Sequence, residues 1–153
     1  MGWENMTTSV VLFVPYYTPK SLARHQELRD CLRHNAQRHM FKRIVLITDD
    51  GTLVETDAEN SSPIVQVHIK ERPTFADWIR LTLQHGSDAE LSVLANSDIL
   101  FPHNFKQQAL AELPQSQTAL CISRHETERS GTMTLHSMPH WSQDAWCLSL
   151  IHI

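Results

Sequence analysis

The sequence carries, at residues 9–14, the run Ser9-Val10-Val11-Leu12-Phe13-Val14, which is mostly apolar and rich in β-branched side chains. Such a run is typical of a strand buried on both faces, because neither face then requires polar residues. A second run, Arg43-Ile44-Val45-Leu46-Ile47, has the same pattern and breaks at the polar turn Thr48-Asp49-Asp50-Gly51. Between them, leucines at near-helical spacing predict a helix from Thr18-Pro19, as N-cap and first helical residue, to Met40. Strand, helix and strand together predict a parallel crossover.

The alternation of strands and helices continues along the remaining chain. Short apolar or alternating runs predict further strands, and amphipathic stretches with capping residues predict further helices. This order predicts an α/β three-layer sandwich with a mostly parallel central sheet, in a single domain without internal repeats. The further strands are expected at residues 64–69, 91–95 and 118–123, with a short one at 132–135, and the further helices at 73–86 and 103–113.

Length and composition restrict the class of protein. The chain of 153 residues is close to the commonest length of one domain, and its 41% hydrophobic and 20% charged residues indicate neither a disordered nor a membrane-embedded protein. No apolar run approaches the ~20 residues that span a bilayer, and the amino end lacks the layout of a signal peptide. We therefore predict a cytoplasmic protein. The net charge of −4, without a dense stripe of Lys and Arg, argues against nucleic acid as a partner.

Several cysteine, histidine and aromatic side chains are predicted to be structural. The three cysteines are odd in number and far apart, which favours reduced thiols over disulfides. His136 and His140 are four residues apart, but Pro139 interrupts the helix that a zinc pair would need. The expected core residues are Phe75, Trp78, Cys31, Cys121 and Cys147, whereas His34 is expected in solvent.

Candidate binding loops follow the carboxyl ends of predicted strands, where ligands bind in open α/β sheets. They span residues 15–18, 48–51, 96–98 and 124–126, and three of the four carry acidic side chains. Carboxylate oxygens suit a hard cation or a hydroxyl-rich ligand. With only four glycines, the sequence has no dinucleotide fingerprint or Walker-type phosphate loop, and it contains no Gly-x-Ser-x-Gly elbow.

Six short segments of the sequence carry a family resemblance: Cys31–Asn35, Ile44–Leu46, Arg72–Phe75, Ala95–Ile99, Ser123-Arg124 and Ser142–Trp146. They fall in the order seen in a group of poorly characterised glycosyltransferase-like proteins, so the resemblance spans nearly the whole chain. Those proteins are similar to A-type glycosyltransferases, in which a Rossmann-like α/β domain binds a nucleotide sugar. The resemblance implies a fold of the nucleotide-diphospho-sugar transferase type, a nucleotide-sugar donor, and a glycan or other hydroxyl acceptor.

By this resemblance, Asn96-Ser97-Asp98 occupies the place of an Asp-x-Asp motif at the end of a central strand. That motif holds a divalent cation, Mn²⁺ or Mg²⁺, which neutralises charge on the departing diphosphate. Asn96 stands where the full motif has its first carboxylate, which leaves Asp98 as the anionic metal ligand. The resemblance therefore implies a divalent cation held by Asp98.

The resemblance also implies roles for residues in the other loops. Asp144 lies where such enzymes carry an acidic residue that faces the acceptor, and it would act as the general base. Asp49 or Asp50 would contact the base or the ribose of the donor. Arg124 would pair with the diphosphate or with Asp98.

Each of these aspartates also has a purely structural interpretation. Asp98 and Asp144 could cap a helix or form a turn, and Asp49-Asp50-Gly51 is an ordinary turn sequence. The alternative function is a catalytically silent domain of the same fold that binds a nucleotide or a glycan. A third hypothesis is a glycoside hydrolase in which Asp98 and Asp144 flank a sugar, although an acidic motif at a strand end fits a leaving diphosphate better.

The carboxyl end, Cys147-Leu148-Ser149-Leu150-Ile151-His152-Ile153, follows Trp146 without a turn or cap. It resembles a translated adaptor read more than protein-family sequence. We therefore expect residues 1–146 to be a truncated glycosyltransferase-like domain and residues 147–153 to be a non-native tail. An apolar tail without a partner would leave an exposed patch that favours association.

Overall fold

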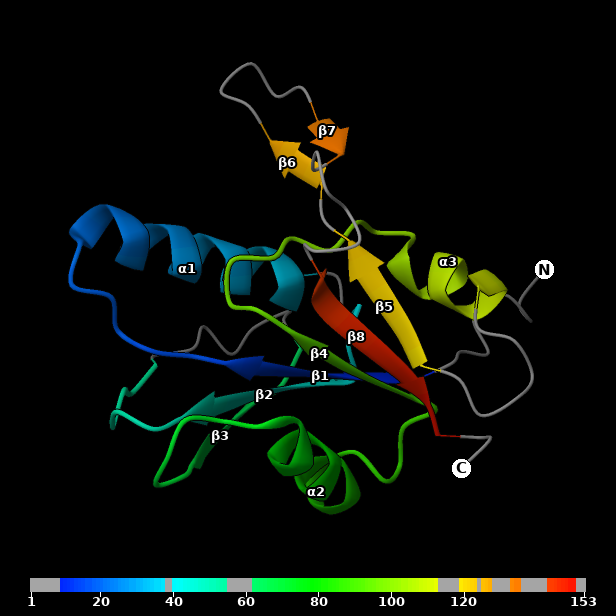
Figure 1. Ribbon diagram of the computed structural model, residues 1–153, viewed down its shortest axis with the longest axis horizontal. Coiled ribbons are helices and arrows are strands. Elements are labelled where there is room, and N and C mark those ends of the chain that lie inside the picture. The colour runs from blue at the N-terminus through cyan, green and yellow to red at the C-terminus, as the bar shows by residue number, and fades with distance from the viewer. Residues whose placement is uncertain are drawn as a thin grey trace.

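In the computed structural model, a six-stranded sheet forms the centre of the molecule, and a separate pair of short strands stands apart from it (Figure 1). The structure describes residues 9–37, 40–54, 62–112, 119–123, 125–127, 133–135 and 143–150. The elements are β1 (Val10–Pro15), α1 (Leu22–Ala36), β2 (Arg43–Thr48), β3 (Ile64–His68), α2 (Phe75–His85), β4 (Leu91–Ala95), α3 (Phe105–Glu112), β5 (Ala119–Ser123), β6 (His125–Thr127), β7 (Met133–Leu135) and β8 (Gln143–Ser149).

Two hydrophobic cores lie on opposite faces of the central sheet, because successive side chains of a strand point to opposite sides. On β1, Val10, Leu12 and Val14 belong to one core, whereas Val11 and Phe13 belong to the other. Helices α1 and α3 cover the first face and α2 covers the second (Figure 1). Strands β1, β2 and β4 are buried on both faces, as their continuous apolar runs predict.

The strand order of the central sheet is β3-β2-β1-β4-β8-β5. All its paired strands run parallel except β8, which is antiparallel to both β4 and β5. From β1 the chain builds outward through β2 to β3, and it then returns to place β4 on the other side of β1. The predicted α/β three-layer sandwich with a mostly parallel sheet is confirmed.

Helix α1 begins later and ends earlier than predicted. Its N-cap is Ser21, whose hydroxyl accepts a hydrogen bond from a backbone N–H of the first turn, and its last residue is Ala36 rather than Met40. The prediction of Thr18-Pro19 as the helix start is wrong because Thr18 is tied to another loop. Its backbone N–H donates to the Asp50 carboxylate at 3.1 Å.

Strand β8 is missing from the sequence-based prediction because its residues contain no β-branched run. It lies between β4 and β5, with Ala145 opposite Ala95 of β4. Residues 147–149, which the sequence analysis assigns to a tail, continue this strand, and Cys147 is fully buried. Their non-native origin stays a prediction, since a place in a strand carries no information about origin.

The three cysteines are free thiols, but they differ in burial. Cys31 and Cys147 are buried as predicted, and burial raises the pKa of the Cys31 thiol to about 11 and that of the Cys147 thiol to about 12. Both thiols are therefore protonated at neutral pH and poor nucleophiles. The prediction of Cys121 as a core residue is wrong, because it lies exposed on β5, at the edge of the sheet.

A chain of buried hydrogen bonds joins α2 to β4. The Trp78 indole N–H donates to the Ser92 hydroxyl at 2.9 Å, and the Thr82 hydroxyl donates to the Trp78 carbonyl at 2.8 Å. The Ser92 and Thr82 hydroxyl oxygens are 2.8 Å apart, so Ser92 is the donor between them. Ser92 has no exposed surface, so these buried polar groups find their hydrogen-bond partners in one another rather than in water.

We expect Ser92→Ala to lower the free energy of unfolding by about 1–3 kcal/mol, because it leaves the buried Trp78 N–H without an acceptor. Urea denaturation followed by tryptophan fluorescence measures the change. Ser87→Ala, at an exposed position, is the matched control and should change little. Equal stability of the two variants would contradict the network.

Asp88, in the turn before β4, connects this turn to the start of β2. Its carboxylate oxygens lie 3.3 Å from an Arg43 guanidinium nitrogen and 3.0 Å from the Lys42 ammonium. The hydrogen bonds from Arg43 and then Lys42 lower the pKa of Asp88 to about 2. A carboxyl group with a lowered pKa stabilises the folded state above its unfolded pKa and loses that effect as the pH falls through the folded pKa.

We therefore expect Asp88→Asn to be less stable than the wild type at pH 7, by at most about 1 kcal/mol because the carboxylate is half exposed. The difference should disappear between about pH 4 and about pH 2, where the wild-type carboxylate also becomes neutral. Urea denaturation of both proteins across this range tests the expectation. A difference as large at pH 2 as at pH 7 would show that charge is not its cause.

Candidate functional site

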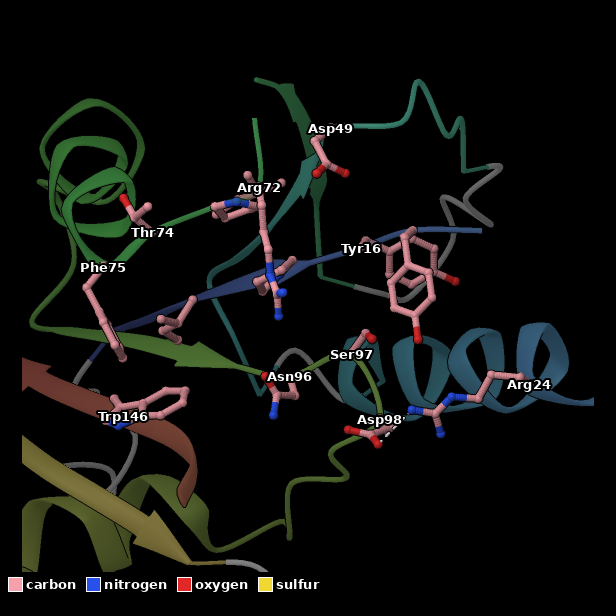
Figure 2. Close-up of a pocket in the computed structure, with 15 residues that line it drawn as sticks. Tyr16, Arg24, Asp49, Arg72, Thr74, Phe75, Asn96, Ser97, Asp98 and Trp146 are labelled. Carbon is pink, nitrogen blue, oxygen red and sulfur yellow. Dashed lines mark hydrogen bonds and ion pairs between the residues drawn. The ribbon is translucent and has the colours of Figure 1, made fainter. Parts of the chain in front are cut away.

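A pocket of about 640 Å³ opens at the carboxyl edge of the sheet, among the loops that follow β1, β2, β3 and β4 (Figure 2). Its volume lies within the range of about 300–1,000 Å³ that is usual for small-molecule sites. Helix α1 and strand β8 contribute one lining residue each. The lining residues are Pro15, Tyr16, Tyr17, Arg24, Ile47, Asp49, Arg72, Pro73, Thr74, Phe75, Leu94, Asn96, Ser97, Asp98 and Trp146.

Helix α1 fixes the end of the loop that follows β4. The Asn35 side chain, on a residue that is 5% exposed, donates to the Ile99 carbonyl at 2.7 Å and accepts from the Phe101 N–H at 3.0 Å. The preceding residue of α1, His34, also contacts this loop, since its ring nitrogen Nε2 lies 3.0 Å from the Phe101 carbonyl oxygen. The prediction that His34 is solvated is therefore wrong, since its ring is part-buried and hydrogen-bonded.

Asp98, the predicted metal ligand, lines the pocket, and it forms an ion pair with Arg24 of α1. The distance between Arg24 Nη2 and Asp98 Oδ2 is 2.9 Å (Figure 2). Hydrogen bonds to Glu27, Asp98 and Tyr17 raise the pKa of the Arg24 guanidinium further above its ordinary value. Arg24 thus offsets part of the charge of Asp98, because the same guanidinium also pairs with Glu27 at 2.7 Å.

Asn96 and Asp144 are joined through side chain and backbone. The Asn96 side-chain amide donates to Asp144 Oδ1 at 2.9 Å, and the Asn96 backbone N–H donates to the Asp144 carbonyl at 3.0 Å. The amide nitrogen of Asn96 therefore faces Asp144, and the amide oxygen can accept a hydrogen bond from a ligand. Asn96 lines the pocket, whereas Asp144 is 8% exposed and does not.

The two neighbouring aspartates after β2 have different surroundings. Asp49 is exposed and lines the pocket, whereas Asp50 does not line it. The Asp50 carboxylate accepts hydrogen bonds from the Thr52 hydroxyl and from the backbone N–H groups of Thr18 and Thr52, and these bonds, the hydroxyl's above all, lower the pKa of Asp50. Gly51, with φ +74°, closes this turn in the left-handed region. Asp50 therefore connects the loops after β1 and β2.

Arg72, after β3, is a pocket residue that the sequence-based selection of loops misses. Figure 2 shows its side chain extending from this loop toward the middle of the pocket, between Asp49 and Asn96. Among the residues that the structure describes, Arg72 forms no ion pair. The same rule could have identified Arg72 from the sequence, because the loop after β3 also follows the carboxyl end of a strand. Arg124, the predicted diphosphate partner, lies outside the described residues.

One end of the pocket is aromatic. The rings of Phe75 and Trp146 meet edge to face, with centroids 5.1 Å apart. Phe75 is the first residue of α2 and is 55% exposed, so its prediction as a core residue is wrong. Trp78, one turn further on, is buried as predicted. This aromatic wall can contact the apolar face of a sugar ring or another flat ligand.

The donor set of the pocket does not fit a resident divalent cation. Among the residues described, no group of three or more His, Cys, Asp and Glu side chains is placed to hold a metal ion. Two arginines and two aspartates line the pocket, so their charges cancel. Asn96 is neutral, and Asp98 already pairs with Arg24. The implied Mn²⁺ or Mg²⁺ therefore finds no support in these residues.

Solved structures of other proteins share this architecture. A 4-diphosphocytidyl-2C-methyl-D-erythritol synthase from Anaerococcus prevotii DSM 20548 superimposes with a TM-score of 0.54, at 10% identity, over 92% of this chain and 70% of its own. A protein from Desulfovibrio desulfuricans G20, assigned as a nucleotide-diphospho-sugar transferase, gives 0.50 at 15% identity over 94% of this chain and 64% of its own. The fold is of the nucleotide-diphospho-sugar transferase type. The fold that the resemblance implies is thus confirmed.

At these identities the likeness to nucleotide-diphospho-sugar transferases shows the fold alone, and the chain spans less than two thirds of the second protein. A mannosyltransferase from Pyrobaculum calidifontis, in complex with GDP-Man and Mn²⁺, gives a TM-score of 0.49 at 15% identity over 75% of this chain and 35% of its own. That score is too low to support an inference about this chain. No protein-family model matches the sequence, and no curated protein matches it.

We expect Asn35→Ala to loosen the loop after β4, because the buried Phe101 N–H and the Ile99 carbonyl lose their partners. The free energy of unfolding should fall by about 1–3 kcal/mol. Amide hydrogen exchange should become faster at residues 97–101. Gln107→Ala, at an exposed position of α3, is the control. Exchange in Asn35→Ala as slow as in the wild type would show that α1 does not hold the loop.

Proposed function

We propose that this chain is a glycosyltransferase-like domain, which binds a nucleotide sugar in the pocket and transfers the sugar to a hydroxyl of a glycan or other acceptor. The observation that carries the proposal is the place of the pocket. It lies at the carboxyl edge of the sheet, beside the reversal of strand order between β1 and β4, in a fold of the nucleotide-diphospho-sugar transferase type. The resemblance of the sequence to glycosyltransferase-like proteins supports the same class.

In this proposal the nucleoside lies at the end of the pocket formed by Tyr16, Tyr17 and Asp49. The Asp49 carboxylate accepts hydrogen bonds from the ribose hydroxyls or from a base N–H. Tyr16 lines this end of the pocket but is 3% exposed, and its buried hydroxyl has no hydrogen-bond partner among the described residues. Burial raises the pKa of Tyr16, so this hydroxyl is a donor at neutral pH. The two other contacts predicted for the donor remain predictions: Asp50 is engaged by Thr18 and Thr52, and Arg124 is not described.

The transferred sugar lies at the other end, near Asn96 and the aromatic wall of Phe75 and Trp146. The acceptor oxygen forms a bond to the anomeric carbon, the bond from that carbon to the diphosphate oxygen breaks, and the acceptor proton passes to a base. Asp144 is the predicted base, but its Oδ1 accepts from the Asn96 amide, which lies on the pocket side of it. Asp144 thus orients Asn96, and its part in proton transfer stays a prediction.

The second candidate function is a catalytically silent domain that binds a nucleotide or a glycan. The observation in its favour is the engagement of both predicted reactive carboxylates: Asp98 pairs with Arg24, and Asp144 is buried behind Asn96. The same contacts argue against a glycoside hydrolase with Asp98 and Asp144 as its pair of carboxyl groups, because both groups of such a pair must reach the sugar.

The cellular location of the protein and the exclusion of nucleic acid as a partner remain predictions from the sequence. In the part of the chain that the structure describes, no helix is long and apolar enough to cross a membrane. The cytoplasmic location rests on the sequence alone, as does the exclusion of nucleic acid as a partner.

We expect one member of a panel of UDP-, GDP-, ADP-, CDP- and TDP-linked sugars to raise the thermal unfolding midpoint, because a ligand that binds only the folded state stabilises it. Asp49→Ala should weaken this shift. The control Asp30→Ala, at an exposed position of α1 outside the pocket, should keep it. No shift with any member of the panel, in a chain shown to be folded, would refute the proposal.

The same panel separates the two candidate functions. With the sugar nucleotide that binds and a mixture of glycan acceptors, a transferase releases nucleoside diphosphate, which a coupled assay detects. Binding without release on any acceptor would favour the silent domain.

A further inference from the structure

We infer that Arg72, rather than a bound divalent cation, neutralises the diphosphate of the ligand, so that nucleotide binding in this pocket does not require a metal ion. The inference rests on the proposed function, since it concerns the diphosphate of the same donor. It replaces the role that the resemblance gives to Asp98 with a role for a residue that lies on the opposite side of the pocket.

The carboxylate to which the resemblance assigns a metal is already engaged. Even a Mg²⁺ or Mn²⁺ ion shared with a diphosphate takes one or two carboxylates from the protein. The loop after β4 offers Asp98 alone, and Asp98 Oδ2 lies 2.9 Å from the Arg24 guanidinium. A dication on the same carboxyl group would be repelled by that guanidinium or would have to displace it. Asn96 adds no negative charge, and its amide is held by Asp144.

Arg72, by contrast, has the charge and the place to meet a phosphate. Among the described residues it forms no ion pair, and it points toward the middle of the pocket (Figure 2). A guanidinium group presents a planar fork of N–H donors that matches two phosphate oxygens, and it gives up its hydration more easily than an ammonium group. An unpaired arginine therefore gains more from a diphosphate than a paired one.

The backbone around Arg72 is well anchored. Pro73 restricts the residue before it to extended conformations, and Thr74 is the N-cap of α2. The Thr74 hydroxyl accepts from the Asp77 N–H at 3.2 Å, and the Asp77 carboxylate accepts from the Thr74 N–H at 2.9 Å. This capping box fixes the backbone two residues after Arg72, so less backbone freedom is lost when Arg72 closes on a ligand.

The charge of the whole pocket agrees with this assignment. The charges of Arg24, Arg72, Asp49 and Asp98 cancel, so the empty pocket does not attract cations as a cluster of carboxylates would. With Arg24 and Asp98 paired to each other, Asp49 and Arg72 are the remaining charges, and Arg72 is the one that extends toward the middle of the pocket. A diphosphate is the part of a nucleotide sugar that complements it.

The test is calorimetric titration of the full chain with ADP, CDP, GDP, TDP and UDP, each in EDTA and again in MnCl₂. The variants are Arg72→Ala, Arg72→Lys and the control Arg33→Ala, at an exposed position of α1 outside the pocket. We expect one nucleotide to bind wild type and Arg33→Ala equally well in EDTA and in MnCl₂. Arg72→Ala should lower its affinity about 10- to 100-fold, and Arg72→Lys should lower it less. The affinity for the matching nucleoside, which has no phosphate, should not change in any variant.

The outcomes distinguish this inference from the proposed function. Binding that appears only with Mn²⁺, or that Arg72→Ala leaves unchanged, overturns the role of Arg72 while the nucleotide site survives. An equal loss of affinity for the nucleoside in Arg72→Ala also overturns it, because the defect is then not at the phosphates. If no nucleotide binds a folded wild type in either solution, the proposed function fails and this inference fails with it.

Discussion

The structure depends on the hydrogen bonds that strand β1 makes on both of its edges. Because β2 and β4 both pair with it in parallel, three strands point their carboxyl ends the same way. After β1 the chain proceeds to β2 on one side of the β1–β4 pair, and after β4 it proceeds to β5 on the other side. The loops after these strands cannot follow one another across the sheet, so a crevice opens between them. The strand order therefore determines where the pocket lies, and the side chains determine only its lining.

The polar side chains at this crevice fall into two groups. Most of them are engaged with the protein: Asp50 connects two loops, Asp98 pairs with α1, and Asp144 orients Asn96. These contacts give the loops a defined shape, but they leave few charges for a ligand. The side chains that can meet a ligand include Asp49, Arg72 and the aromatic wall of Phe75 and Trp146, which together suit a ligand with an anionic centre and flat ends.

The sequence predicts the part of the fold that depends on continuous apolar runs, as in β1, β2 and β4, and it places Asp49, Asn96 and Asp98 in the pocket through the same strand ends. It misses β8, whose burial comes from its neighbours rather than from its own pattern. Partners far along the chain are also invisible to it: nothing local in the sequence shows that Asp98 meets Arg24, or that His34 reaches the loop after β4. The prediction that Phe75 is a core residue fails for a related reason. Helical spacing predicts which residues share one face of a helix, but it does not show whether another element covers that face.

The place of β8 also has a consequence for how the chain folds as it is synthesised. Strands β1 to β4 can pair as soon as they leave the ribosome, but β5, made next, has no place beside β4, because β8 later takes that position. Until residues 143–149 emerge, the edge of β4 is unpaired and β5 lacks its partner. Open strand edges invite pairing with other chains, so the nascent protein is most prone to aggregation in the interval between making β4 and making β8.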